Sequence, residues 1–568
     1  MENERSETPA TGGYLVEVLT PLFGPALLAF FGTSLLLARL DLSDLPGPAS
    51  GQLISRLALV EEGRPVSAVH AALAAWTELS PLPLLADLRL LMGPLVSAGA
   101  TLGASLAGRA LAGGGALGRR AAWACGLAMA CCSAVVEAST WIALEPLAIA
   151  LALLGLGTAM AASSGAARWL PLAAPGVAAV LLAGELREVG LPFRALLPVL
   201  PLLAWRRPLR ALLLALGVGL SLSLGPEWAA GWAGGEEGGA RHTHSPLLSF
   251  RAAGTGLSEL SGMLYQPSLG RLSLYLPLCA LALPAALVPG PRWLARAGFG
   301  GLGVLATGLT VEALDPGWLR LRYLAVMSTG LVLLSGLSAA GLSRLLRGRP
   351  ALSLLPSLAL AGLLATDSLD ALWTSARERA PYTGIASPRL PEPTGLRFVL
   401  NGRAMGTSPH ALAVDRAVEL WEVAASAGRP VAATPLQDER GAQVVAVAAL
   451  MGSPAVLMRA EQCCPAGQSS EECAGALLHE LDAAGVDLVL PRPAGTDWRF
   501  SSQDPLAPRL RALAIERGLP LEGGLSWTRV RAREEGGALP CRQRLPRLLD
   551  ARPTPPEIQR GQWWPAPR

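Results

Sequence analysis

The chain has 568 residues, of which 51% are hydrophobic and only 16% charged, and its formal net charge is +4. Its mean hydropathy of +0.41 is too high for a soluble protein of this length, so the composition excludes an ordinary water-soluble enzyme. It predicts a polytopic α-helical membrane protein instead.

The amino-terminal residues 1–12 are polar and acidic, and they lack the basic start of a secretory signal peptide. We interpret the following apolar segment as an uncleaved anchor. Short polar breaks divide the region from Tyr14 to Thr366 into about eleven segments that approach the length needed to cross a bilayer. The predicted spans are 15–38, 90–108, 121–136, 142–162, 169–184, 191–205, 211–224, 272–288, 298–314, 323–342 and 351–366.

Every second break carries arginine and no acid. Twelve arginines lie in these arginine-only breaks, at 109–120, 168, 206–210, 292–296 and 344–349. The intervening breaks carry the acids, among them Glu145, Glu185 and Glu312. Because arginine is retained on the cytoplasmic side of a membrane, this alternation predicts a bacterial inner-membrane protein with a cytoplasmic amino terminus and an extracytoplasmic carboxyl-terminal region.

Two outer loops are long. In the loop 40–89, apolar residues recur at helical spacing and predict helices lying on the membrane surface, whereas the loop 225–271 is rich in glycine. These loops and the spans form a membrane domain over 1–366.

A soluble region follows the last span. We expect a linker over 367–395, an extracytoplasmic α/β domain over 396–550 and a disordered tail over 551–568. The domain alternates predicted helices (411–427, 472–484, 506–517) with β-type runs (430–435, 455–458, 486–490, 526–530), which predicts a largely parallel sheet.

Eight cysteines divide into two groups. Four lie within spans, where cysteine is usually a small apolar filler. The other four lie in the outward domain, where disulfides are plausible: Cys463 or Cys464 with Cys473, and the other with Cys541. A zinc site is the competing interpretation, although no pair shows zinc-finger spacing.

Several runs resemble known sequences. Residues 86–109 place Leu-Arg before a helix rich in small residues, 184–207 place Arg187 before an apolar run that ends in arginines, 319–324 read LRLRYL, and Trp527–Val530 read WTRV. With the order of spans and loops, they resemble the GT-C glycosyltransferases of the protein O-mannosyltransferase and aminoarabinose transferase type (glycosyltransferase family 39-like).

The resemblance implies a GT-C-like membrane domain that transfers a sugar from a polyprenyl-phosphate carrier to a glycolipid, protein or polysaccharide acceptor outside the membrane. The family's first outer loop normally opens with an Asp-Glu pair before a glycine. Aligning on Gly63 puts Pro48, Ala49 and Ser50 there, and none of these can act as a base. The nearest acids, Asp44 and then Asp41, are our candidates for the catalytic carboxylate. The alternative interpretation is that both are interfacial residues that cap a helix.

Cations must hold the carrier phosphate, and Arg322, Arg320 and Arg187 are the candidates, because a guanidinium offers phosphate two parallel donors. Tyr323 adjoins them in the sequence, and Glu145 begins a span where an acid usually faces a cavity. The alternative for the arginines is contact with lipid headgroups.

No cofactor is expected with certainty, and a divalent cation is a possible requirement. His242 and His244 are weak candidate metal ligands, since two histidines in a glycine-rich loop more often belong to a solvated segment. Nucleic acid is not an expected partner, because the basic residues adjoin lipid headgroups. Two other functions stay open: a catalytically degenerate homologue that binds lipid or acts as a scaffold, and a transporter or flippase.

Overall fold

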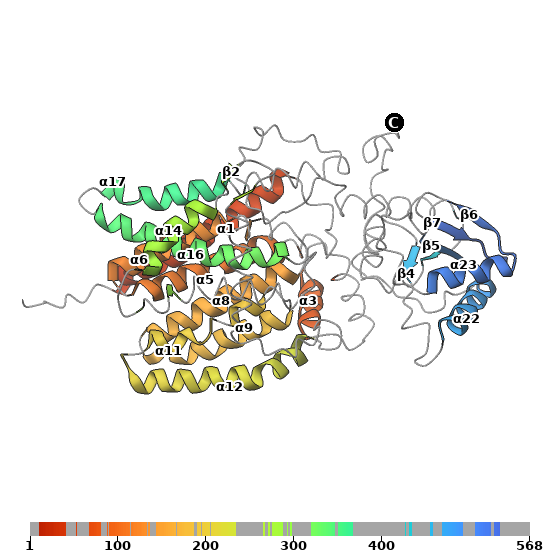
Figure 1. Cartoon of the computed structure of the whole chain (residues 1–568), viewed down its shortest axis with the longest axis horizontal. Coiled ribbons are helices and arrows are strands. Elements are labelled where there is room, and N and C mark those ends of the chain that lie inside the picture. Colours follow the sequence, from red (N-terminus) through yellow and green to blue (C-terminus); the bar gives the residue numbers. More distant parts are fainter. Residues whose placement is uncertain are drawn as a thin grey trace, which may run out of the picture. The chain divides into compact units, whose positions relative to one another are not determined.

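The computed structural model describes a helical region and a small α/β region (Figure 1). The described residues are 11–40, 53, 68–80, 88, 90–113, 115–132, 135–136, 144–165, 167–186, 190–194, 196–204, 206–233, 265–266, 271–272, 275–287, 292, 296–297, 320–346, 350–366, 368, 427, 431–433, 455–457, 469–491, 506–523 and 527–533.

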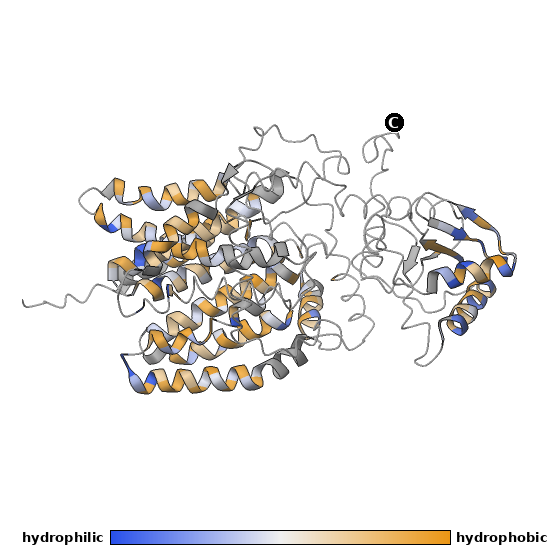
Figure 2. Ribbon diagram, viewed as in Figure 1, coloured by the Kyte–Doolittle hydropathy of each residue, from blue (hydrophilic) through white to orange (hydrophobic). Residues whose placement is uncertain are grey.

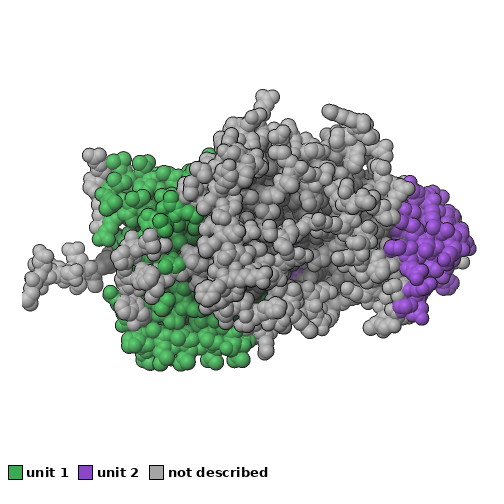
Figure 3. Space-filling model, in the orientation of Figure 1, with its two compact units in different colours: residues 1–40, 89–375, 389–402 green, residues 41–88, 376–388, 403–568 purple. Residues whose placement is uncertain are grey.

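The chain forms two compact units (Figure 3). The helical unit comprises Met1–Leu40, Arg89–Ser375 and Arg389–Gly402. The α/β unit comprises Asp41–Leu88, Ala376–Pro388 and Arg403–Arg568. The expected domain limits and the outward location of the second domain stay predictions.

The helices of the helical unit follow the predicted spans. They are α1 (Thr11–Leu40), η1 (Leu91–Leu95), α5 (Val96–Ala112), α6 (Gly115–Ala130), α8 (Leu144–Ser164), η2 (Ala167–Leu172), α9 (Ala173–Leu186), α10 (Leu191–Arg194), α11 (Val199–Leu203), α12 (Pro208–Ala233), α14 (Tyr275–Leu287), α16 (Arg320–Leu345) and α17 (Pro350–Ser353), and a further helix runs over Leu355–Thr366. A short antiparallel pair joins β1 (Tyr265–Gln266) to β2 (Arg271–Leu272). The predicted span 298–314 lies outside the described residues.

Three of the described helices are long and apolar enough to cross a membrane: Leu91–Ala112, Pro146–Ser164 and Pro208–Gly225. The first begins with the π-helical turn η1, which contains Pro94, a residue that has no backbone N–H to donate. The predicted span 191–205 differs from expectation, since it forms the two short helices α10 and α11 rather than one continuous helix. Pro192, Pro198 and Pro201 explain the break, because proline interrupts the helical hydrogen-bond ladder.

Glycine sets the closest packing in this unit. Helix α8 lies between α5 and α9, and it turns a different glycine toward each. A Cβ added at Gly103 of α5 overlaps the backbone of Leu153, and one added at Gly157 overlaps Gly103 itself. On the other side, a Cβ at Gly155 comes within 2.6 Å of the carbonyl oxygen of Gly176 in α9. Small residues that let backbones approach are typical of helix contacts in membranes.

Helix α12 exposes a long apolar face, visible as the orange ribbon in Figure 2. Leu209 is 71% exposed, and the other exposed leucines of this helix are Leu212, Leu213, Leu216, Leu220 and Leu224. A soluble protein rarely leaves an apolar surface of this kind uncovered. The surface fits a helix that faces lipid.

The arginine-only breaks gather at one end of the helical unit. Arg120 donates from Nη1 to the carbonyl oxygen of Ser343 at 3.0 Å, which joins the break 109–120 to the break after α16. The guanidinium of Arg292 lies against Gly113, which joins 292–296 to the same group. Burial, and then the charge of Arg206, lower the pKa of Arg292, so the break 206–210 also lies nearby. We call this region the arginine end.

The fifth arginine-only break, at 168, lies at the same end, because Arg207 and Arg210 at the start of α12 bind the end of α8 just before it. Arg210 donates from Nη1 to the carbonyl oxygen of Gly165 at 2.8 Å and from Nη2 to that of Ala162, and Arg207 donates to Gly165 at 3.3 Å. These carbonyls are the unpaired acceptors that every helix leaves at its carboxyl terminus, here that of α8. Two arginines therefore cap α8 and join the break at 168 to the break at 206–210.

The α/β unit contains a five-stranded sheet in the order β4-β3-β5-β7-β6. Its strands are β3 (Val431–Ala433), β4 (Ala455–Leu457), β5 (Asp487–Pro491), β6 (Leu521–Gly523) and β7 (Trp527–Val530). Strands β4, β3 and β5 are parallel, whereas β7 is antiparallel to both β5 and β6. The expectation of a largely parallel sheet therefore holds for one half only, because β6 and β7 form a hairpin that the sequence reading missed.

Two helices pack on the sheet. In α22 (Ser470–Ala483) and α23 (Leu506–Glu516), the buried leucines include Leu477, Leu478 and Leu510, which meet Leu488 and Val530 of the strands. A capping box starts α22: Ser469 Oγ accepts from the N–H of Glu472, whose carboxylate accepts from the N–H of Ser469. The unit also contains α3 (Ala68–Leu79), the described part of the amphipathic loop 40–89, in which Leu73 and Ala74 are buried. The expected helix 411–427 lies outside the described residues, except for Ala427.

Candidate functional site

The end opposite the arginines is where the sequence predicts the site. Helix α16 has 26 residues and is therefore about 39 Å long. Its last turn contacts Arg120 at the arginine end, so its first turn lies at the opposite end. Helices α6 and α9 also start at the arginine end and finish here, and α8 starts here. Ser368 Oγ, beyond the last helix, donates to the carbonyl oxygen of Cys131, beyond α6, at 2.6 Å. We call this region the acidic end.

Four of the predicted site residues lie on helices that begin at the acidic end. Glu145 is the second residue of α8, and Arg320, Arg322 and Tyr323 occupy the first turn of α16. Their side chains lie outside the described part of the structure. The other candidates are wholly outside the described residues: Asp41, Asp44, Arg187, His242 and His244. Their predicted roles stay predictions.

One ionised pair at the acidic end is described in detail. Arg194 of α10 donates from Nη2 to Glu185 Oε1 of α9 at 2.6 Å and to the carbonyl oxygen of Leu181 at 2.5 Å. The two side chains are 15% and 20% exposed. Charges removed from water to this extent need a partner, and each supplies the other.

Glycines make room for this pair. A Cβ at Gly184 overlaps the guanidinium of Arg194, and a Cβ at Gly190 overlaps the carbonyl of Ala183, so the chain folds back tightly between α9 and α10. The sequence predicted Glu185 as an acid of an outer break and did not predict its pairing with Arg194. The available signal is the Gly-Leu-Pro sequence at 190–192, where the chain turns back. The turn brings Arg194 against Glu185, nine positions earlier in the sequence.

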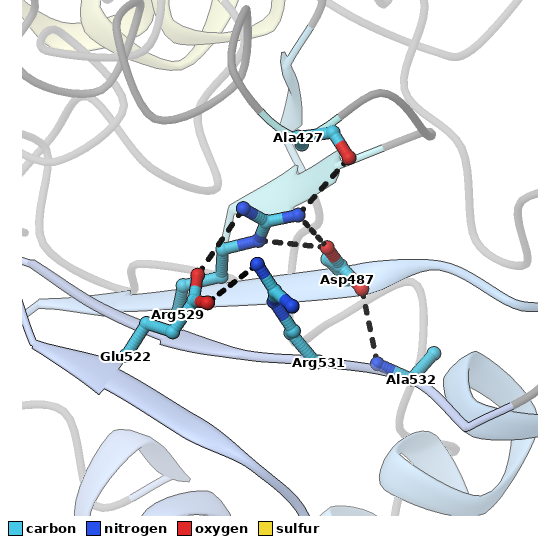
Figure 4. Close-up of polar contacts among 6 residues, drawn as sticks. All are labelled: Ala427, Asp487, Glu522, Arg529, Arg531 and Ala532. Carbon is cyan, nitrogen blue, oxygen red and sulfur yellow. Dashed lines mark hydrogen bonds and ion pairs between the residues drawn. The ribbon is translucent and has the colours of Figure 1, made fainter.

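The sheet of the α/β unit holds a second charged cluster (Figure 4). Asp487 Oδ2 accepts from Arg529 Nε at 2.7 Å and also from Nη2, while Asp487 Oδ1 accepts from the N–H of Ala532 at 3.0 Å. Arg529 further donates to Glu522 at 3.3 Å and to the carbonyl of Ala427 at 3.2 Å. Arg531 pairs with the other Glu522 oxygen at 2.5 Å.

This cluster has the features of a structural ion pair. Asp487 is fully buried, and both of its carboxylate oxygens accept hydrogen bonds. It is also the first residue of β5, opposite the first residue of β3, whereas ligands of parallel sheets bind beyond the carboxyl ends of the strands. The cluster therefore joins the parallel half of the sheet to the hairpin.

Metal ligands and cysteines were also candidates. Within the described residues, no three His, Cys, Asp or Glu side chains gather as a metal site. Cys473, which is buried in α22, is disulfide-bonded. Its predicted partner, Cys463 or Cys464, and Cys541, predicted to pair with the other of these two, lie outside the described residues, so the pairing stays a prediction. The described cysteines of the helical unit, Cys125, Cys131, Cys132 and Cys279, are not disulfide-bonded.

The fold defines a helical membrane protein, and comparisons with known proteins add little to that class. No protein-family model and no curated protein matches the chain. The chain is similar to a solved structure of ArnT from Cupriavidus metallidurans bound to undecaprenyl phosphate. The sequence identity is 15%, the match covers 93% of this chain and 100% of that chain, and the TM-score is 0.48. A superposition at this level does not establish a family.

Proposed function

We propose that the chain is a membrane glycosyltransferase of the GT-C type. It moves a sugar from a polyprenyl-phosphate donor to an acceptor on the extracytoplasmic face, and its site lies at the acidic end of the helical unit. The acceptor is a glycolipid, a protein or an envelope polymer.

One observation carries this proposal. The arginine-only breaks meet at one end, yet the helix positions of Arg320 and Arg322 lie at the other. The sidedness of arginine in membranes does not account for cations at the outward end of a span. A phosphate group beside this helix does account for them, because its anionic oxygens accept parallel hydrogen bonds from a guanidinium group.

The reaction is a single displacement with inversion at the anomeric carbon. The carboxylate of Asp44, or of Asp41, takes the proton of the acceptor as its nucleophilic atom bonds to that carbon. The bond between the anomeric carbon and the phosphate oxygen breaks, and the electron pair leaves with the polyprenyl phosphate. Arg322, Arg320 and Arg187 stabilise the charge of this leaving group.

Native mass spectrometry with undecaprenyl phosphate tests the lipid part. We expect wild-type protein to retain this lipid, and Arg322→Ala or Arg187→Ala to retain about tenfold less, as for the loss of one charged hydrogen bond. Arg344→Ala is the matched control, because Arg344 is exposed in the last turn of the same helix as Arg322, at the opposite end. Retention no greater than for other anionic lipids contradicts the proposal.

The double variant Asp41→Asn, Asp44→Asn tests the chemical part. A transferase loses turnover of a lipid-linked sugar in this variant while it still binds the lipid. If sugar transfer continues unchanged, these carboxylates are not the base. If wild-type protein binds the lipid without any transfer, the degenerate, lipid-binding alternative replaces the enzyme.

A further inference from the structure

A cavity at the arginine end combines charged, hydroxyl and apolar side chains. Its volume is about 650 Å³, within the range of roughly 300–1,000 Å³ typical of small-molecule sites. Helices α1, α6, α16 and α17 and the helix Leu355–Thr366 border it (Figure 1). It lies at the end of the helical unit opposite the proposed transferase site.

The charge of this cavity is positive. Arg119 and Arg120 of α6 line it together with Ser343 and Ser353. Arg120 is held in place by its hydrogen bond to the carbonyl of Ser343. None of the lining residues is acidic, and among the described residues neither guanidinium forms an ion pair. The cavity therefore favours an anion.

The cavity also has an apolar wall deeper along the helices. Leu127 lies eight positions beyond Arg119 on α6, which is about 12 Å along the helix and away from the arginine end. Across from it, Leu354 and Leu358 line the cavity and are 61% and 56% exposed. The neighbouring Leu355 is also exposed, so the apolar wall of the cavity is continuous with the outer surface of the helical unit. We infer that the cavity opens toward the acyl chains of the bilayer. A soluble anion has no use for such a wall.

We propose that this cavity binds an anionic phospholipid from the cytoplasmic leaflet. Its phosphate lies between Arg119 and Arg120, and its acyl chains lie along Leu127, Leu354 and Leu358. Basic pockets between spans on the cytoplasmic side suit such headgroups. The proposal is independent of the transferase proposal, because it concerns other residues at the other end of the spans.

Native mass spectrometry of the full chain tests the lipid preference, with phosphatidylglycerol, phosphatidylcholine and inorganic phosphate as probes. We expect phosphatidylglycerol to be retained about tenfold better than phosphatidylcholine, as for one charged hydrogen bond. Arg119→Gln reduces this preference, and Ser357→Trp reduces binding by filling the cavity with both arginines kept. Arg344→Gln, at the same end but outside the lining, leaves the preference unchanged.

Each other outcome overturns the proposal. Equal retention of the two lipids shows that the cavity does not recognise the anion. A loss in Arg344→Gln as large as in Arg119→Gln assigns the preference to the diffuse charge of the arginine end. Displacement of phosphatidylglycerol by inorganic phosphate at similar concentration identifies the ligand as a soluble anion. Size-exclusion elution like that of wild type confirms that each variant is folded.

Discussion

The two units of this protein are held together in different ways. In the helical unit, α5, α8 and α9 meet where glycine backbones touch, while leucines point outward on α12. In the α/β unit, leucines point inward between the helices and the sheet, and Gly485 and Gly518, which have positive φ, follow the ends of α22 and α23. The difference follows from the solvent. In lipid, moving a leucine from the bilayer into a helix contact gains no hydrophobic free energy, whereas close contact between backbones gains van der Waals energy. Four sets of substitutions test this contrast.

The largest effect is expected where glycine permits backbone contact. Gly103→Leu places a side chain where the backbone of α8 at Leu153 lies. Because packed backbone cannot move aside, we expect the helical unit not to assemble. Gly217→Leu is the control, because a Cβ at Gly217 has nothing within 4 Å. Size-exclusion profiles in detergent distinguish the two. Similar aggregation of both variants contradicts the packing argument.

In the α/β unit, the largest expected effect comes from charge. Asp487→Ala leaves Arg529 buried with only the more exposed Glu522, and removing one member of a buried pair costs about 3–5 kcal/mol. Glu471→Ala breaks the exposed pair with Arg509 instead, which we expect to cost less than about 1 kcal/mol. Protease resistance of the full chain in increasing urea measures both. Equal losses contradict the assignment of Asp487–Arg529 as the structural pair.

Replacing a glycine of this unit by alanine changes the stability by a smaller amount, and the sign of the change depends on where the glycine lies. Gly485 and Gly518 have φ of +63°, so Gly485→Ala or Gly518→Ala costs about 1–2 kcal/mol. Gly475 lies inside α22, where an added Cβ meets nothing nearer than Arg517 Nη2 at 3.8 Å, so Gly475→Ala stabilises the unit by about 0.5–1 kcal/mol. The same urea assay measures both, and a loss of stability in Gly475→Ala contradicts the prediction.

The smallest effect concerns the start of α22. Hydrogen bonds from the backbone and side chain of Ser469 lower the pKa of Glu472 below its ordinary value. The carboxylate's contribution is therefore fully present above that ordinary value and is lost as the pH falls through the lowered pKa. Glu472→Gln keeps the cap but cannot titrate, so its stability changes less between pH 7 and pH 3. Melting temperatures at the two pH values test this, and equal pH dependence of both proteins contradicts it.

Hydropathy and charge predicted the positions of most helices and the grouping of the arginines, because both depend on residues close together in the chain. The strands β3, β4, β5 and β7 were also predicted from short β-type runs. Strand β6 was missed, because Leu521–Gly523 contains a charge and a glycine and buries none of its three residues. Its place in the sheet depends on pairing with β7.

The pairings were not predictable in the same way. Arg529 meets Asp487 across 42 positions, and nothing local in either segment indicates the other. Arg194 and Glu185 are closer in sequence, but they meet only because the chain folds back tightly between α9 and α10. The glycine contacts of α8 depend on which neighbours surround it, and hydropathy does not contain that information. The candidate site was the least predictable part from the residues themselves, since its catalytic carboxylates follow only from a resemblance.

The capped end of α8 bears on how the chain is made. The carbonyls of Ala162 and Gly165 are satisfied by a side chain that lies 48 and 45 positions later. During synthesis α8 leaves the ribosome well before Arg210 does, so for that interval its last turn must rely on water or headgroups. The cap of α8 is therefore complete only after the start of α12 has been made.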